Sequence, residues 1–142
     1  MKTLIKLLLF LLLSFSLFNQ SIFASERIRI GLIVPLSGDN SLIGEKIIKS
    51  IRMAINKIND DRIEIIPKDT KSNPIDALKV SKELYKEGVR IILGPVFNES
   101  TKYLDDLKDV TFISFTNKLI GNPNNVISAG VNAISQLHTI KK

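Results

Sequence analysis

The stretch IRIGLIVPLSGDNSLIGEKIIKSI, residues 28–51, decides the fold. Residues 28–34 are apolar at nearly every position, which is typical of a parallel strand that is covered on both faces. A polar loop begins at Pro35, and from about Ser41 the apolar residues recur at helical spacing. The stretch therefore predicts a buried strand that leads through a polar loop into an amphipathic helix.

Two long helices are expected. The first spans about 41–59, and we expect its apolar face to cover a sheet; this face consists of Ile43, Ile47, Ile51, Ala54, Ile55 and Ile58. The second lies between 73 and 88, because Asn73 can cap it, Pro74 suits its first turn and Gly88 permits a left-handed end. The buried face of this second helix would be Ala77, Val80, Ser81 and Leu84.

The rest of the chain alternates strands with helices. Residues 62–66 alternate polar and apolar, which indicates a strand at the edge of the sheet. Further strands are expected at 89–93, 110–115 and 126–129, a short helix at 99–108, and the start of another at 132–142. Strands that alternate with helices pair in parallel through right-handed crossovers. The predicted fold is therefore α/β, a doubly wound parallel sheet.

The first 24 residues have the layout of a secretory signal peptide. Lys2 and Lys6 precede an apolar stretch over 7–18, which is shorter than the roughly 20 residues that a membrane-spanning helix needs. The small residues Ala24 and Ser25 then offer a cleavage site. The alternative is a signal anchor that stays attached. We expect cleavage after Ala24, a periplasmic mature chain, and no stable insertion in the membrane.

Composition removes several classes of function. The chain has no cysteine, so we expect no lipid anchor, disulfide, thiol catalysis or cysteine-bound zinc. Its net charge is +6, but the lysines are scattered among acids and do not alternate with aromatic residues as a nucleic-acid platform requires. We therefore interpret the basic balance as a solvated surface and expect no nucleic-acid partner.

The sequence also lacks recognisable catalytic and cofactor-binding motifs. Gly31, Gly38 and Gly44 lack the spacing of a dinucleotide-binding loop or a P-loop. His138 is the one histidine, and the adjacent carboxylates of 60–61 and 105–106 diverge on regular elements. No ligand cluster for a metal appears in the sequence. The expectation is a chain without enzymatic activity, cofactor or metal.

Ligand binding remains, because the loops after the expected strands are polar. In open parallel sheets, ligands bind outside the carboxyl ends of the strands. Here those ends lead into 35–44, 68–74, 94–101 and 114–125, which are rich in hydroxyls, amides and glycine. Such loops suit a small molecule that is held by hydrogen bonds, or a surface that is presented to a protein.

The residues also carry a family resemblance. The PLSG loop at 35–38, the NP helix start at 73–74 and ILGPV at 92–96 follow one another as in the first lobe of type I periplasmic binding proteins of the leucine-binding class. The likeness runs from about 28 to 131. It implies domains of 1–24, the signal peptide, and 25–142, a truncated N-terminal lobe whose second lobe is absent.

This resemblance implies a function and a site. Proteins of this class close two lobes around an amino acid or similar small polar solute and deliver it to an ABC-type membrane transporter. By position, the ligand-binding residues would come from the loops after the first, third and fourth strands: Ser37, Asn40, Ser41, Phe97, Asn98, Ser100, Ser114, Thr116 and Asn117.

Two alternatives stay open. IEIIPKDT at 63–70, ILGPVF at 92–97 and ISFTN at 113–117 also resemble the corresponding domain of penicillin-binding protein activators, which would imply contact with a peptidoglycan synthase. The sequence given ends at Lys142, before a second lobe. A non-functional fragment is therefore the third interpretation.

Overall fold

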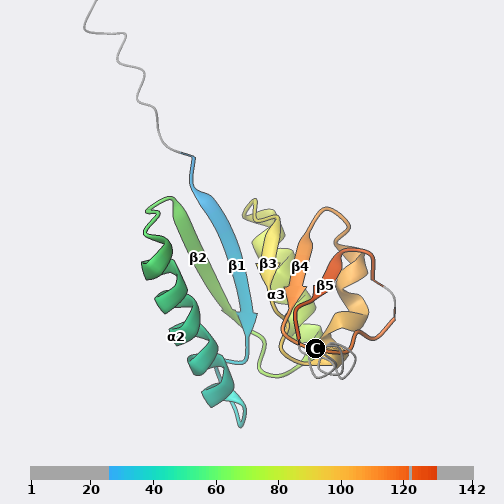
Figure 1. Ribbon diagram of the computed structural model, residues 1–142. Helices are drawn as coiled ribbons and strands as arrows, with labels where there is room; N and C mark the ends of the chain where they lie inside the picture. Colours follow the sequence, from blue (N-terminus) through green and yellow to red (C-terminus); the bar gives the residue numbers. More distant parts are fainter. Residues whose placement is uncertain (1–25, 122, 131–142) are drawn as a thin grey trace, which may run out of the picture.

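The computed structural model describes residues 26–121 and 123–130, which form a five-stranded parallel sheet in the order β2-β1-β3-β4-β5 (Figure 1). The strands are β1 (Ile28–Val34), β2 (Ile63–Asp69), β3 (Ile91–Leu93), β4 (Thr111–Ser114) and β5 (Val126–Ser128). The helices are α2 (Ser41–Ile58), α3 (Pro74–Lys86) and the 3-10 helix η1 (Asn98–Asp106). The predicted α/β doubly wound parallel sheet is confirmed.

The structure differs from the predictions most clearly at β2, β3 and η1. β2 is the edge strand that the alternation indicated, but it continues past Ile66 through Pro67 to Asp69. Proline is tolerated there because an edge strand leaves one row of backbone groups unpaired. β3 has only three residues, and the expected short helix after it is a 3-10 helix. The predicted helices within 41–59 and 73–88 are confirmed.

One face of the sheet is fully packed. Gly31, Ile92, Phe112 and Val126 lie in register across β1, β3, β4 and β5. The last three belong to a buried core together with residues of α3 and η1, such as Leu84 and Leu104. A side chain at position 31 would collide with Leu84, so glycine lets α3 approach the sheet. Ala77, Ser81 and Leu84 of the predicted face of α3 are buried, whereas Val80 is half-buried.

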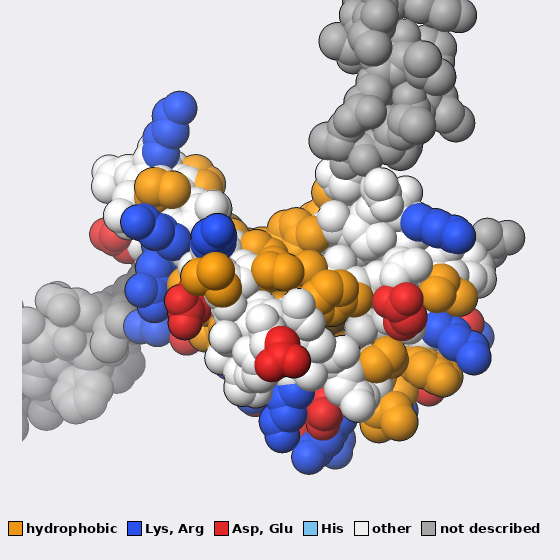
Figure 2. Space-filling model, turned by 90° about the horizontal axis from the view of Figure 1, so that it is seen from below, with side chains coloured by type: hydrophobic (Ala, Val, Ile, Leu, Met, Phe, Trp, Pro, Cys, Tyr) orange, Lys and Arg blue, Asp and Glu red, His pale blue; other side chains and the backbone are white. Residues whose placement is uncertain are grey.

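The described residues cover the opposite face only in part. Leu32, Leu93, Ile113 and Ile127 form the next row in register. The exposed fraction is 1% for Leu32, which lies beside Ile48 and Ile51 of α2, but 57% for Ile127. Figure 2, which looks onto the carboxyl edge of the sheet, shows hydrophobic side chains gathered in a hollow to the right of α2.

The expectation that the whole apolar face of α2 covers the sheet is wrong. Gly44 is the one buried residue of α2, and Ile43, Ala54 and Ile58 are exposed. The helix lies over β1 and β2 at one side of the sheet, where Ile48 and Ile51 face Leu32 and Ile65 across a small cavity. The outer part of its apolar face therefore has no neighbour among the described residues.

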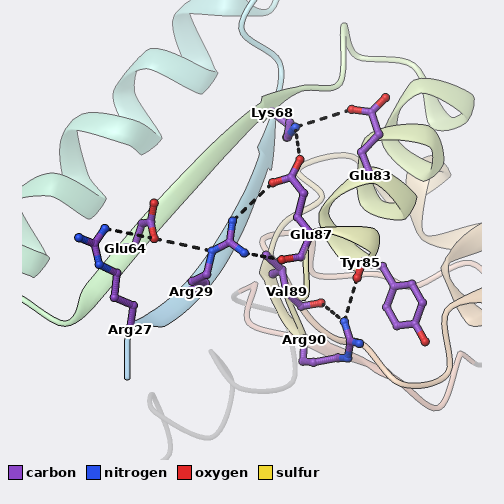
Figure 3. Close-up of polar contacts among 9 residues, drawn as sticks. All are labelled: Arg27, Arg29, Glu64, Lys68, Glu83, Tyr85, Glu87, Val89 and Arg90. Atoms are coloured by element: carbon purple, nitrogen blue, oxygen red, sulfur yellow. Dashed lines mark hydrogen bonds and ion pairs between the residues drawn. The ribbon is translucent and has the colours of Figure 1, made fainter. Parts of the chain in front are cut away.

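Ion pairs join the first two strands to the end of α3 (Figure 3). Arg29 of β1 lies 3.7 Å from both Glu64 of β2 and Glu87, which follows α3. Lys68 of β2 lies 2.9 Å from Glu87 and 3.8 Å from Glu83 of α3. These groups are partly exposed, and exposed pairs contribute at most about 1 kcal/mol each. The network therefore orients α3 on the sheet more than it stabilises the fold.

Two of the sequence predictions lie outside the described residues: the signal peptide at 1–24 and the helix at 132–142. Within the described part of the chain, none of the helices has the length and hydropathy of a membrane span.

Candidate functional site

The candidate site is a pocket at the carboxyl edge of the sheet. Parallel strands bring the loops after β1, β2 and β3 to this one edge. Here those loops and the starts of α3 and η1 border an open cavity of about 240 Å³. The residues that line it are Asn40, Ser72, Pro74, Phe97, Glu99 and Ser100. Three of them, Asn40, Phe97 and Ser100, are among the predicted site residues.

Asp69, the last residue of β2, holds the opening loop in place. Its carboxylate accepts hydrogen bonds from the backbone N–H of Leu36 at 2.8 Å and from the Ser37 hydroxyl at 2.6 Å. The backbone N–H of Lys71 donates a third, also at 2.8 Å. One carboxylate thus fixes both the loop after β1 and the loop after β2.

These bonds also set the acidity of Asp69. Burial is the largest influence and favours the neutral acid, but the Ser37 hydroxyl and the backbone N–H groups of Leu36, Lys71 and Ser37 stabilise the charged form. Together they hold the pKa of Asp69 below its ordinary value of 3.8. The carboxylate is therefore ionised at neutral pH, and its hydrogen bonds hold the two loops.

The loop after β2 has an unusual backbone. Lys71 and Ser72 both adopt left-handed conformations, with φ of 50° and 58°, which for residues other than glycine cost about 1–2 kcal/mol each. The Lys71 bond to Asp69 offsets part of this cost, and so does the 3.1 Å bond that Asn40 Nδ2 donates to Ser72 Oγ. This second bond closes one wall of the cavity.

Two glycines let the loops come together. A Cβ at position 44 would overlap the carbonyl oxygen of Pro35, so only glycine allows α2 to begin directly against the end of β1. Gly94 has φ of +112°, and a Cβ there would overlap the carbonyl oxygen of Ile33. Both glycines bring backbone close to backbone at the edge where the cavity lies.

A second cavity adjoins the first. It has a volume of about 510 Å³, lies between the start of α3 and η1, and shares Pro74 and Glu99 with the smaller one. Its other lining residues are Asn73, Ile75, Lys102, Tyr103 and Ile120. The edge of the sheet therefore carries a two-part depression with one shared acidic residue.

Two predicted site residues, Ser114 at the end of β4 and Thr116 in the loop that follows, use their hydroxyls within the protein. Ser114 is fully buried; its hydroxyl donates to the carbonyl oxygen of Pro95 at 3.0 Å and accepts from the N–H of Thr116 at 3.3 Å. The Thr116 hydroxyl donates to the Lys118 carbonyl and accepts from the Lys118 N–H. These bonds shape the loop, so neither hydroxyl has its full capacity left for a ligand.

The other four predicted residues do not line the cavity. Ser37 is exposed and bonded to Asp69, and Ser41 is half-buried at the start of α2. Asn98 is half-buried and its carbonyl accepts the Thr101 hydroxyl, while Asn117 is exposed. Ligand contact by these residues stays a prediction.

Sequence reasoning missed four residues of this edge: Asp69, Ser72, Pro74 and Glu99. The segment 68–74 is predicted as a loop at the carboxyl edge, but nothing in its sequence distinguishes the residues that line the cavity from their neighbours. Glu99 could have been found from its place between Phe97 and Ser100. Within the described ranges, no group of three or more His, Cys, Asp or Glu residues could hold a metal.

Comparison with known proteins identifies the family. Residues 27–140 match the periplasmic binding protein family, and the chain belongs to it. No curated protein sequence matches the chain. The family assignment confirms the resemblance to the leucine-binding class of type I proteins.

Solved structures of this family have the same fold. A leucine-binding protein from Thermotoga maritima is 19% identical, with a TM-score of 0.61 over 70% of this chain and 31% of its own. A solute-binding protein of an ABC transporter from Rhodopseudomonas palustris, in complex with 3,4-dihydroxybenzoic acid, is 26% identical, with a TM-score of 0.59 over 63% of this chain and 27% of its own. The chain thus spans about a third of these proteins, which corresponds to one lobe.

A regulator of a penicillin-binding protein is also similar. The C-domain of LpoA from Haemophilus influenzae, a regulator of PBP1A, is 17% identical, with a TM-score of 0.60 over 80% of this chain and 38% of its own. At this identity the likeness shows the shared fold.

Proposed function

We propose that this chain forms one wall of a periplasmic solute-binding protein, which holds an amino acid or a similar small polar solute for an ABC-type transporter. The observation that carries the proposal is the cavity of about 240 Å³ at the carboxyl edge, lined by Asn40, Phe97 and Ser100. Amide and hydroxyl groups beside one aromatic ring suit a small molecule with a polar head and an apolar body.

Family membership supports the same conclusion. The relatives from Thermotoga maritima and Rhodopseudomonas palustris are described as binding leucine and an aromatic acid. The chain carries no recognisable catalytic motif, so the proposed role is binding without chemistry.

A thermal-shift screen tests the proposal. The purified chain is screened against amino acids and small aromatic acids, and a stabilising solute is expected. A ligand in thousandfold excess over its dissociation constant stabilises by about 4 kcal/mol, so even modest affinity is visible. Ser100→Ala should weaken the shift, whereas Ser50→Ala, at an exposed position of α2 outside the cavity lining, is the matched control and should leave it unchanged. Absence of any stabilising solute contradicts the proposal.

A second candidate is contact with a peptidoglycan synthase. The bound hydroxyls of Ser114 and Thr116 favour it, because they leave the loop after β4 less able to hold a solute. In this case the chain would be retained by an immobilised peptidoglycan synthase in a pull-down, and the solute screen would find no ligand.

A further inference from the structure

Glu99 is the acidic residue that the two cavities of the candidate site share. It lines both the 240 Å³ cavity and the 510 Å³ cavity. Among the described residues that line the smaller cavity, it is the one charged side chain; the others are Asn40, Ser72, Pro74, Phe97 and Ser100. Any solute that enters this pocket therefore meets a negative charge.

The charge of Glu99 is not neutralised by a nearby cation of the described chain. No lysine or arginine of residues 26–121 and 123–130 lies within ion-pair distance of its carboxylate. Lys102 is one turn further along η1, where residues three apart share a face. Its Nζ, however, lies 5.4 Å from the centre of the Tyr103 ring. Among the described residues Glu99 therefore has no ion-pair partner, although Lys102 also lines the larger cavity.

Apolar surface surrounds this carboxylate. Ile75 and Tyr103 in the larger cavity are 71% and 39% exposed, and Ile120 and Pro74 line the same depression. Phe97 is half-buried in the smaller cavity. These side chains can cover the hydrocarbon part of a ligand, and the ring of Phe97 also favours a cation over an anion.

We propose that Glu99 makes this site selective for ligands that carry a protonated amine on an apolar body. The inference rests on the proposed function and adds the ligand class. The ammonium group donates charge-assisted hydrogen bonds to the Glu99 carboxylate, while the apolar body lies on Pro74, Ile75 and Tyr103. A ligand whose single charge is a carboxylate is repelled by Glu99 and binds more weakly.

Pairs of probes that share a hydrocarbon part but carry opposite charges separate the effect of ligand charge from the effect of ligand shape. Benzylamine and benzoate share one ring, and 3-methylbutylamine and 3-methylbutanoate share one branched chain. Affinities for all four are measured by titration calorimetry on the wild-type chain, Glu99→Gln and Glu26→Gln. Glu26 is an exposed glutamate before β1, at the opposite edge of the sheet, and provides the control. Denaturant unfolding of each variant confirms that the fold is retained.

The amines are expected to bind at least tenfold tighter than their matched acids. Glu99→Gln should reduce amine affinity by at least tenfold and improve binding of the acids, whereas Glu26→Gln should change neither. Tighter binding of the acids, or equal amine affinity in Glu99→Gln, overturns the selectivity while the solute-binding function stands. If none of the four probes binds and the amino-acid screen is also empty, both proposals fail together.

Discussion

The carboxylate of Asp69 accepts a hydrogen bond from the backbone N–H of Leu36 at 2.8 Å, which ties the end of β2 to the loop after β1. The two residues are 33 positions apart, and they are brought together by the parallel pairing of Val34 with Asp69. The polar loop that follows the first strand is therefore positioned by a residue of its neighbouring strand.

The first prediction is that Asp69→Ala destabilises the protein and loosens the opening loop. The substitution leaves three donors without their acceptor, and hydrogen bonds to charged groups are worth about 1.5–3 kcal/mol. Because the site is partly exposed, we expect a loss of about 1–2 kcal/mol in urea unfolding. Asp39→Ala, at an exposed position in the same loop, should cost less than about 0.5 kcal/mol. Equal losses would contradict the role of Asp69.

The second prediction concerns pH. The folded-state pKa of Asp69 is lowered below 3.8, so its contribution to stability is fully present above 3.8 and is lost as pH falls through the lower, folded-state value. The difference in unfolding free energy between wild type and Asp69→Asn should therefore be constant from pH 5 to 7 and shrink in the acid range. A difference that grows on acidification would show that the sign is wrong.

The third prediction separates structural from binding hydroxyls. Ser114→Ala should cost about 1–3 kcal/mol, because it leaves the Thr116 N–H without its partner and removes one of the two hydrogen bonds to the Pro95 carbonyl, which also accepts from the Phe115 N–H. Ser100→Ala should instead change stability little and weaken solute binding, since Ser100 lines the cavity. Urea unfolding and titration calorimetry on both variants check this split. The opposite pattern would move the binding site to the loop after β4.

The fourth prediction concerns the face of the sheet that the described residues cover only in part. Ile127 belongs to the row that begins at Leu32, and Ile91 lies on the same face of the sheet; both side chains are exposed. We therefore expect the purified chain to self-associate through this surface. The double variant Ile91→Thr and Ile127→Thr should shift the population toward monomer in sizing chromatography with light scattering. Phe112→Ala, on the buried face, should instead reduce stability by about 3–5 kcal/mol. An unchanged wild-type monomer at high concentration would refute the expectation.

The fifth prediction is export. The basic start, short apolar stretch and small residues at 1–24 predict cleavage after Ala24. Mass spectrometry of protein produced in a Gram-negative host should therefore find a chain that begins at Ser25 in the periplasmic fraction. A full-length product in the membrane fraction would indicate a signal anchor.

The sequence by itself determined the class of fold and most of its elements. The apolar run at 28–34, the helical spacing after Ser41 and the capping residues Asn73 and Pro74 are local signals. Asn73 Oδ1 indeed accepts from the N–H groups of Ile75 and Asp76, which lie two and three residues away. Such contacts depend only on nearby residues, so the sequence is sufficient to predict them.

The tertiary structure alone decided which polar side chains face the cavity. Ser100 in η1 and Ser114 at the end of β4 are both buried serines, yet one lines the pocket and the other is bonded to Pro95, 19 residues away. Asp69 meets Leu36, and Glu99 joins two cavities, only because the strand order places these loops at one edge. A hydroxyl or carboxylate can satisfy its hydrogen bonds with any nearby donor or acceptor, and the nearest ones come from distant parts of the chain.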